Sequence, residues 1–389
     1  MKILVLTRST GEGHNRVAQA VRLIAQARGH DCQVMDAMVV AGQESTVETS
    51  AERGPGTSGW RARSADLANK IYGWVALKTP FAFGAVYALG EVYTRTPIPS
   101  PIYFQNAKWA EATQAYIEDH GYEVVVTTHL FPQETLAVVR RLFPSKVRYL
   151  AVLTDYTCIP FFSEAMMDGF MIPHPDLVRE CVRGGIPRSR LYVTGMPVAP
   201  QFSQRLSKAE ARAKLGLLDD VPVFLVMSGG VGSMRTGELC DGLLTVGGED
   251  TQLVVLTGRR EDLFRQIAGR YQADPRVKVV PFTDRVSDYM AAADVLLTKP
   301  GGASSAEAAV VGLPIIHTGA IPGNETKNTR FFTQHGMSIH LPRVDAAVRA
   351  AHDLINDEAA MERMKACQAR NVIADSAERV IACIEGTVW

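Results

Sequence analysis

The sequence predicts an α/β protein made of two doubly wound, Rossmann-like domains. Short runs of apolar and β-branched residues alternate with amphipathic helical patterns along the chain, as expected when helices join parallel strands. The chain has 389 residues, which is long for one hydrophobic core and sufficient for two domains of ordinary size. Prolines and a change of composition interrupt the alternation at residues 197–206, so we expect the domains to divide there.

Each predicted domain has its own set of strands. In the first domain, residues 1–200, strands are expected at residues 3–7, 31–35, 124–128, 148–153, 169–172 and 191–194. In the second domain, residues 201–389, strands are expected at residues 223–227, 252–256, 277–280, 295–298 and 314–317, followed by helices at 357–370 and 376–386. An insertion at about residues 41–106 separates the second and third strands of the first domain.

Composition excludes several classes of protein. The 41 basic and 41 acidic residues give a formal net charge of zero, so no overall field attracts nucleic acid. The six cysteines lack the spacing of a metal site or a disulfide framework, and reduced thiols are expected. The chain has neither a membrane-spanning apolar run nor a signal-peptide pattern at its start, so we expect a cytoplasmic protein.

The most informative segment is residues 298–307, where an apolar strand meets a glycine turn and the start of a helix. Gly301 and Gly302 let the backbone approach a ligand, and the helix that contains Ser304 would offer its free N–H groups to a diphosphate. Glu307, one turn into the helix, is expected to hold ribose hydroxyls. The alternative is an ordinary strand-to-helix turn in which Glu307 is a solvated helix residue.

A second polar loop follows about 20 residues later and offers Pro322, Asn324, Glu325 and Asn328 before another amphipathic helix. Polar groups that converge from neighbouring loops of one α/β layer usually bind a ligand, so the two loops together predict a pocket for a nucleotide sugar.

Two further regions of the second domain are candidates for binding the nucleotide. The loop after the strand at 223–227 opens a helix and predicts a second phosphate cradle, formed by Ser228, Gly229, Gly230 and Gly232. Gly258 and Phe282 end the next two strands and are expected to frame the base.

In the first domain, the loop before residue 14 follows the first strand. Gly11 and Gly13 permit a tight turn there, and His14 lies at the start of a helix. In doubly wound sheets this carboxyl end of the strand is where ligands bind. A helix N-terminus keeps an imidazole neutral, which suits a general base, although a histidine that merely caps the loop is the alternative.

These motifs resemble the inverting glycosyltransferases of family 28, and among them the diacylglycerol glycosyltransferases related to monogalactosyldiacylglycerol synthase and the bacterial processive glucosyltransferases. The resemblance spans nearly the whole chain and rests on residues 3–14, 154–160, 192–198, 299–307, 312–314 and 321–328. Asn324 stands where the family usually has Gln, and the segment Cys158-Ile-Pro160 lacks the His-Pro pair of many relatives.

The resemblance implies the GT-B fold, in which two Rossmann-like domains face each other across a cleft and the last helix crosses back to the N-terminal domain. It implies a UDP-hexose donor bound by the second domain, with Lys299 in the donor site, and an acceptor and membrane bound by the first. The sequence lacks the Asp-x-Asp element that holds a metal in other glycosyltransferases, so no metal and no other cofactor is expected.

For an inverting transfer, a base must remove the proton of the acceptor hydroxyl. His14 is the first candidate. His129 and Asp155, which end neighbouring strands, are the others; the alternatives are a packed loop histidine and a helix-capping aspartate. Asp155 could also orient His14 or raise its basicity.

The insertion combines aromatic and basic residues, which suits a helix lying on an anionic membrane surface, whereas aromatic residues at helical spacing also suit a core. The family resemblance favours the membrane, and thus a peripheral enzyme on the inner face that uses diacylglycerol as acceptor. A homodimer is possible, and no nucleic-acid partner is expected.

Three functions follow. The first is transfer of glucose or galactose from a UDP-sugar to diacylglycerol or a glycosyl-diacylglycerol. The second is transfer of N-acetylglucosamine to a polyprenyl-linked acceptor. The third is a nonhydrolysing UDP-sugar epimerase of the same fold, which would act without an acceptor.

Overall fold

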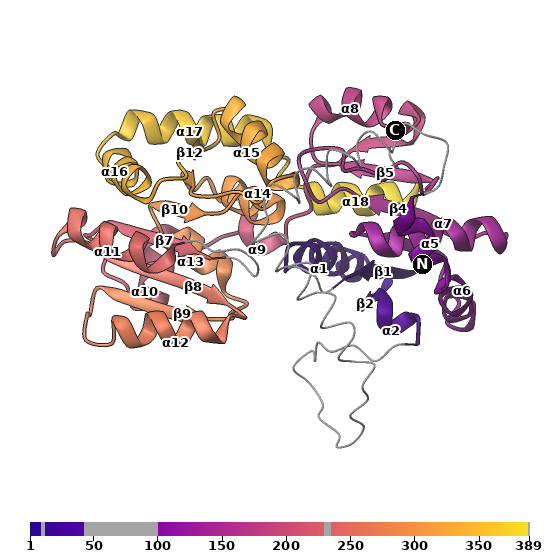
Figure 1. Ribbon diagram of the computed structural model, residues 1–389, viewed down its shortest axis with the longest axis horizontal. Coiled ribbons are helices and arrows are strands. Elements are labelled where there is room, and N and C mark those ends of the chain that lie inside the picture. The colour runs from indigo at the N-terminus through magenta and orange to yellow at the C-terminus, as the bar shows by residue number, and fades with distance from the viewer. Residues whose placement is uncertain (9–11, 43–99, 229–234, 388–389) are drawn as a thin grey trace, which may run out of the picture. The chain divides into compact units, whose positions relative to one another are not determined.

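The computed structural model describes residues 1–8, 12–42, 100–228 and 235–387. It divides into two compact units, the first comprising Met1–Pro197 with Asp375–Trp389 and the second comprising Val198–Ala374. Figure 1 shows the last helix, in yellow, among the purple elements of the first unit. The sequence predicts the division after residue 200, and the unit boundary lies between Pro197 and Val198.

The first unit contains a six-stranded parallel sheet in the order β2-β1-β3-β4-β5-β6. Its strands are β1 (Lys2–Thr7), β2 (Asp31–Asp36), β3 (Val124–Thr127), β4 (Arg148–Val152), β5 (Gly169–Ile172) and β6 (Leu191–Val193). The chain runs from β1 to β2 in one direction across the sheet and from β3 through β6 in the other. The order therefore reverses between β1 and β3, which is the point where doubly wound sheets bind ligands.

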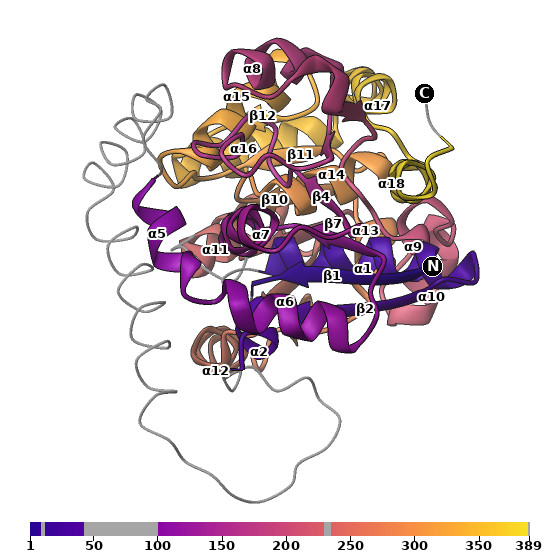
Figure 2. The same ribbon diagram turned by 90° about the vertical axis from the view of Figure 1, so that its right-hand side faces the viewer.

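The helices of the first unit are α1 (Glu12–Ala27), α2 (Ala37–Val40), α5 (Pro101–Ala107), α6 (Ala110–Asp119), α7 (Leu130–Leu142), α8 (Val178–Arg183) and α18 (Ser376–Glu385). Because parallel crossovers are right-handed, the reversal of strand order puts α1 and α7 on opposite faces of the sheet. Helices α5 and α6 both pack against α7, as Figure 2 shows, while α18 packs against α1.

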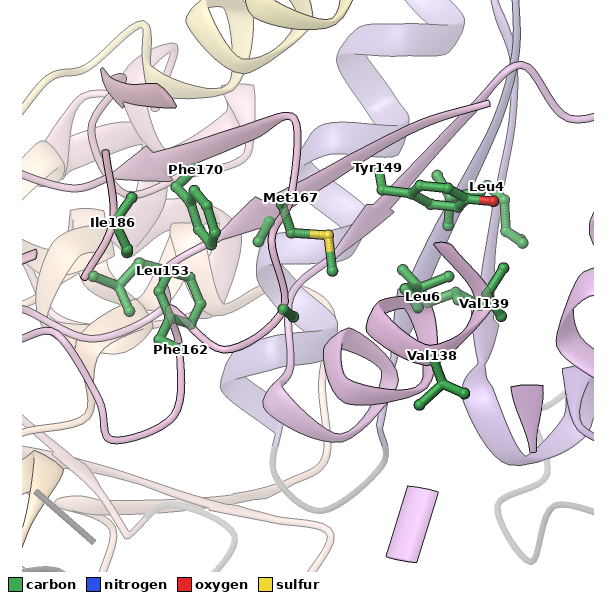
Figure 3. Packing of buried hydrophobic residues seen from close by; sticks show 14 of the residues in the cluster. Leu4, Leu6, Val138, Val139, Tyr149, Leu153, Phe162, Met167, Phe170 and Ile186 are labelled. Carbon is green, nitrogen blue, oxygen red and sulfur yellow. The ribbon is translucent and has the colours of Figure 1, made fainter. Parts of the chain in front are cut away.

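The core of the first unit lies between the sheet and these helices. In Figure 3, Leu4 and Leu6 of β1 point to the same side as Tyr149 of β4, with Val139 of α7 beside them. All four side chains are at most 2 % exposed. Burial of a side chain of this size stabilises the fold by about 1.5–3 kcal/mol, so β1 and α7 are held firmly where their ends carry the polar groups described below.

Polar contacts tie α18 to the first unit. The Arg148 guanidinium donates to the carbonyl of Ile384 at 2.6 Å, which satisfies a helix C-terminal carbonyl that has no partner within the helix. The next residue, Glu385, accepts from Arg28 at 2.8 Å and contacts the ring of His30 at 3.0 Å. These contacts attach the returning chain to both β4 and the segment after α1.

The second unit repeats the architecture with the strand order β12-β11-β10-β7-β8-β9. Its strands are β7 (Val223–Met227), β8 (Gln252–Gly258), β9 (Val277–Pro281), β10 (Val295–Thr298), β11 (Ile315–His317) and β12 (Ile339–His340). Its helices are α9 (Pro200–Ser203), α10 (Lys208–Leu215), α11 (Thr236–Gly247), α12 (Glu261–Arg270), α13 (Val286–Ala292), α14 (Gly302–Val311), α15 (Asn324–Gln334), α16 (Val344–Ile355) and α17 (Glu358–Asn371). The strand order reverses between β7 and β10.

Two features predicted from the sequence, the aromatic insertion and several glycines of the phosphate loops, lie partly or wholly outside the described residues. Residues 43–99, which hold most of the predicted aromatic insertion, lie outside the described residues, as do Gly11, Gly229, Gly230 and Gly232. Within the described ranges, no helix is both long and apolar enough to cross a bilayer.

Candidate active site

The polar groups of the first unit gather where three neighbouring strands end. His14 lies in the first turn of α1 after β1, His129 precedes α7 after β3, and Asp155 follows β4. The rings of His14 and His129 meet edge to face with their centroids 4.5 Å apart. The structure thus brings these three predicted residues together, and we call them the histidine cluster. Gly13 lies beside His14 in the same turn.

The hydrogen bonds of His14 define its tautomer. Its Nδ1 lies 2.8 Å from the carbonyl oxygen of Thr128 and 3.0 Å from the hydroxyl of Thr154. A carbonyl can only accept, so Nδ1 carries the hydrogen and the lone pair of the neutral ring lies on Nε2. The Thr128 hydroxyl in turn donates to the His14 carbonyl at 3.2 Å, which links the start of α1 to the end of β3.

The electrostatic surroundings keep the His14 ring neutral. Burial lowers the pKa of His14, and the negative charge of Asp155 and the hydrogen bond to the Thr128 carbonyl offset part of that shift. A neutral ring with its lone pair on Nε2 can accept a proton, and Asp155 would then stabilise the imidazolium that forms. The pair has the properties of a general base and the carboxylate that supports it.

His129 has different hydrogen bonding. Its Nδ1 accepts from the backbone N–H of Phe131 at 3.1 Å, so the ring caps α7 and its lone pair is engaged. Burial, His14 and Arg8 together hold the pKa of His129 well below its ordinary value. The geometry therefore favours His14 over His129 as the base and gives His129 the role of a cap.

In the second unit, the start of α14 forms the first predicted phosphate loop. Gly301 is the N-cap of the helix, and a Cβ at this position would lie 3.2 Å from the hydroxyl oxygen of Ser304. The backbone N–H groups of this turn are those that a helix N-terminus offers to an anion. Glu307, expected to hold ribose hydroxyls, is only 4 % exposed, so it is not the solvated helix residue of the alternative interpretation.

The second predicted loop is linked to the first by side chains. Lys299 Nζ lies 2.6 Å from Glu325 Oε1, and the N–H of Ile321 donates to Glu325 Oε2 at 2.8 Å. The Asn328 amide donates to the carbonyl of Pro300 at 3.1 Å. We call segments 299–302 and 321–328 the loop pair.

The backbone before α15 requires a glycine. Gly323 has φ +103° and ψ −123°, a conformation that side chains disfavour. This turn places Asn324 and Glu325 at the first positions of α15, and Pro322 precedes it half-buried. An acidic residue in a first helical turn is stabilised by the helix dipole.

Ser228, expected in the other phosphate cradle, ends β7 beside the reversal of strand order. Its hydroxyl lies 3.1 Å from that of Thr236 at the start of α11, and the Ser228 side chain is buried. The hydroxyl thus bridges the strand end and the helix start, and the Ser228 N–H donates to the carbonyl of Leu256 at 3.3 Å, so both groups have partners within the second unit.

A pocket of about 300 Å³ lies at the ends of β8 and β9 and includes both residues expected to frame the base. It is lined by Gly258, Arg259, Glu261, Phe264, Pro281 and Phe282. The Arg259 guanidinium lies 3.8 Å from the centroid of the Phe282 ring, and Phe282 is 49 % exposed. The guanidinium covers one face of the ring, and the opposite face of this half-exposed ring suits stacking of a planar base.

Sequence reasoning did not identify several residues that the structure places in these sites. Thr128 and Thr154 orient His14 through a backbone carbonyl and a hydroxyl, and Ile321 binds Glu325 through its N–H. A contact made by the backbone does not depend on the residue type, so the sequence does not indicate it. The threonine at a strand end was the available signal for Thr154, but many strands end in threonine.

Two family models match the chain in separate segments. Residues 74–198 match the model described as monogalactosyldiacylglycerol (MGDG) synthase. Residues 225–380 match the model of the glycosyltransferase family 28 C-terminal domain. The first match ends beside the unit boundary, and the second contains the loop pair.

Relatives of known name match over most of their length. The chain is 25 % identical over 372 residues to a processive diacylglycerol beta-glucosyltransferase of Bacillus pumilus, covering 94 % of this chain and 89 % of that protein. It is 24 % identical over 371 residues to the protein of the same name from Bacillus licheniformis, covering 93 % and 89 %.

Solved structures share the fold at low identity. MurG of Acinetobacter baumannii has a TM-score of 0.59 at 12 % identity and covers 99 % of each chain. The UDP complex of MnaA from S. aureus has a TM-score of 0.62 at 13 % identity, covering 99 % of this chain and 96 % of that one. Together with the two parallel sheets, these structures confirm the predicted α/β fold of the GT-B class.

Proposed function

Because the chain belongs to the family 28 glycosyltransferases, in the group that contains MGDG synthase and the processive diacylglycerol glucosyltransferases, we propose that it transfers a hexose from a UDP-sugar to diacylglycerol or a glycosyl-diacylglycerol. The observation that carries the proposal is His14, a neutral imidazole with its lone pair on Nε2, supported by Asp155 at the reversal of strand order. The proposed reaction inverts the anomeric configuration.

The proposed chemistry is a single displacement. His14 Nε2 accepts the proton of the acceptor hydroxyl while the hydroxyl oxygen attacks the anomeric carbon from the face opposite the leaving group. The bond from the anomeric carbon to the diphosphate oxygen breaks, and UDP leaves with the bonding electrons. Asp155 stabilises the imidazolium that results. A general base contributes roughly 10²–10⁴-fold to such a rate.

In this proposal the second unit binds the donor. The N–H groups at the start of α14 receive the diphosphate, so a helix terminus takes the place of a metal in neutralising its charge. The uracil stacks on Phe282 in the pocket at the ends of β8 and β9. The loop pair contacts the hexose through Asn324, Glu325 and Asn328, and Glu307 holds the ribose.

We further propose that the protein acts on the inner face of the membrane, where diacylglycerol is available, without spanning the bilayer. The names of the relatives support a lipid acceptor.

The experiment that tests the function uses purified protein with UDP-glucose, UDP-galactose and UDP-N-acetylglucosamine in turn, with and without diacylglycerol in anionic liposomes. Release of UDP and extraction of a new glycolipid only with liposomes would support the proposal and identify the hexose. Proton NMR of the product would give the anomeric configuration, and a product with the donor's configuration would contradict inversion. Conversion of the sugar without an acceptor would indicate an epimerase. A parallel reaction replaces diacylglycerol with a polyprenyl-linked sugar, and transfer to that acceptor alone would indicate the other acceptor class.

A further inference from the structure

Lys299 and Glu325 form an ion pair in the second unit that is largely withdrawn from water. Their side chains are 19 % and 14 % exposed, and Nζ lies 2.6 Å from Oε1. An ion pair that is this shielded depends on its geometry more than an exposed pair does, and loss of one partner leaves the other charge poorly solvated. The position of the Glu325 carboxylate therefore depends on Lys299.

The second carboxylate oxygen is fixed as well. Oε2 accepts from the Ile321 N–H at 2.8 Å, so among the described residues each oxygen of Glu325 has one donor. A carboxylate offers about four lone-pair positions, which leaves capacity on both oxygens for two further donors in a defined direction. Two neighbouring hydroxyls of a hexose are donors of that kind.

The backbones that carry the two residues are also joined. The Asn328 amide donates to the Pro300 carbonyl at 3.1 Å, and the Gly301 N–H donates to the Lys299 carbonyl at 2.9 Å. Thr329 donates to the Glu325 carbonyl at 2.8 Å within α15. The loop that begins α14 and the loop that begins α15 are therefore connected at two separate points, one charged and one neutral.

We propose that Lys299 is a positioning residue that acts through Glu325: it holds the carboxylate for the hexose hydroxyls and so sets the affinity for the sugar part of the donor, not for the nucleotide. The inference rests on the proposed use of a UDP-hexose. It differs from the sequence expectation, in which Lys299 contacts the donor directly. An ammonium has three donors, so only a measurement that separates sugar from nucleotide distinguishes the two roles.

The test compares the dissociation constants of UDP and of the UDP-hexose that the wild type uses, by calorimetry. Lys299→Met should weaken the UDP-hexose about tenfold and change UDP less than twofold. Lys299→Arg should restore most of the loss because it keeps the charge. Glu325→Gln should weaken the hexose similarly, and the double variant should be no worse than either single variant, as expected for residues that act as one unit.

The matched control is Arg330→Met, which removes a positive charge from the exposed surface of the same helix. It should leave both dissociation constants unchanged. Equal weakening of UDP and UDP-hexose by Lys299→Met would overturn the proposal and place the ammonium on the diphosphate. Additive losses in the double variant would overturn it too. If Lys299→Met does not fold, Lys299→Gln removes the same charge and is measured in its place, with the same hexose-specific loss expected and the same equal weakening of UDP and UDP-hexose overturning the proposal.

The proposed function fails in a different way. Wild-type protein that binds UDP but none of the UDP-hexoses would remove the premise, whatever the variants do.

Discussion

The histidine cluster of the first unit and the loop pair of the second unit handle charge in opposite ways. Burial lowers the pKa of His14 and of His129, so both imidazoles of the cluster are kept neutral. In the loop pair, Lys299 and Glu325 are both charged and are matched at 2.6 Å. A base must gain a charge during the reaction and starts without one, whereas a carboxylate that binds hydroxyls acts best when it is already charged and fixed.

The largest effect is expected when the proposed base of the histidine cluster is removed. His14→Ala should reduce kcat by about 10³-fold, because it removes the proposed base, and should leave the dissociation constant of UDP unchanged. Steady-state kinetics with diacylglycerol liposomes and calorimetry with UDP measure the two quantities.

The control for His14 is its neighbour. His129→Asn keeps a side-chain oxygen that can accept from the Phe131 N–H and cap α7, so most of the activity should remain. Full activity in His14→Ala, or a comparable loss in His129→Asn, would show that the base is misassigned.

The next largest effect is expected from a change in the loop pair. Glu325→Ala removes the proposed contact to the hexose, and loss of one charged hydrogen bond of about 1.5–3 kcal/mol should lower turnover between about 10-fold and 100-fold. The affinity for UDP should stay nearly intact, as displacement of a fluorescent nucleotide can show. Unchanged turnover would exclude Glu325 from sugar binding.

Asp155→Asn should sharpen the comparison, because it removes the negative charge that acts on His14 within the histidine cluster. Asp155 raises the pKa of His14, so the variant should lower that pKa further and move the acidic limb of the kcat/KM profile to lower pH. A weaker base also transfers protons more slowly, and the plateau should fall about tenfold. If the acidic limb does not move, Asp155 does not influence the pKa of His14.

The smallest expected effect on activity involves a neutral histidine outside the proposed site residues. In the second unit, His317 contacts the hydroxyls of Ser305 and Ser338 at 3.0 and 3.1 Å, and burial lowers its pKa to about 3. Between pH 6.5 and that value the unfolded chain binds a proton that the folded chain excludes. His317 should therefore cost up to about 1.4 kcal/mol of stability per pH unit as the pH falls.

Urea unfolding at pH 7, 6 and 5 measures this dependence. His317→Gln should unfold with a shallower loss of stability on acidification than the wild type, while activity at pH 7.5 stays close to normal. Parallel pH dependences in the two proteins would mean that His317 titrates normally. The result would also show that burial of a histidine alone does not make it a base.

The topology of the sites could be predicted from the sequence, but their internal contacts could not. Parallel strand ends meet at one edge of a sheet, so residues after β1, β3 and β4 had to lie near each other, and His14, His129 and Asp155 do. β12 was not predicted because a strand of two residues, Ile339–His340, has no detectable periodicity.

The Lys299–Glu325 pair joins residues 26 positions apart in different loops, and neither residue type nor spacing indicates it. The tautomer of His14 depends on a backbone carbonyl, which every residue has. For Ser228 the sequence indicated a loop that favours phosphate, whereas the hydroxyl contact to Thr236 depends on where α11 begins. These details arise from tertiary packing, which local patterns do not encode.

Because α18 belongs to the first unit, the second unit can finish folding before the first during synthesis. The second unit, Val198–Ala374, is contiguous and can fold once its own residues have been made. The first unit must wait for the partner of Arg148, 236 residues further along the chain. Until then, the face of α1 that packs against α18 stays uncovered, because α18 follows the whole second unit along the chain.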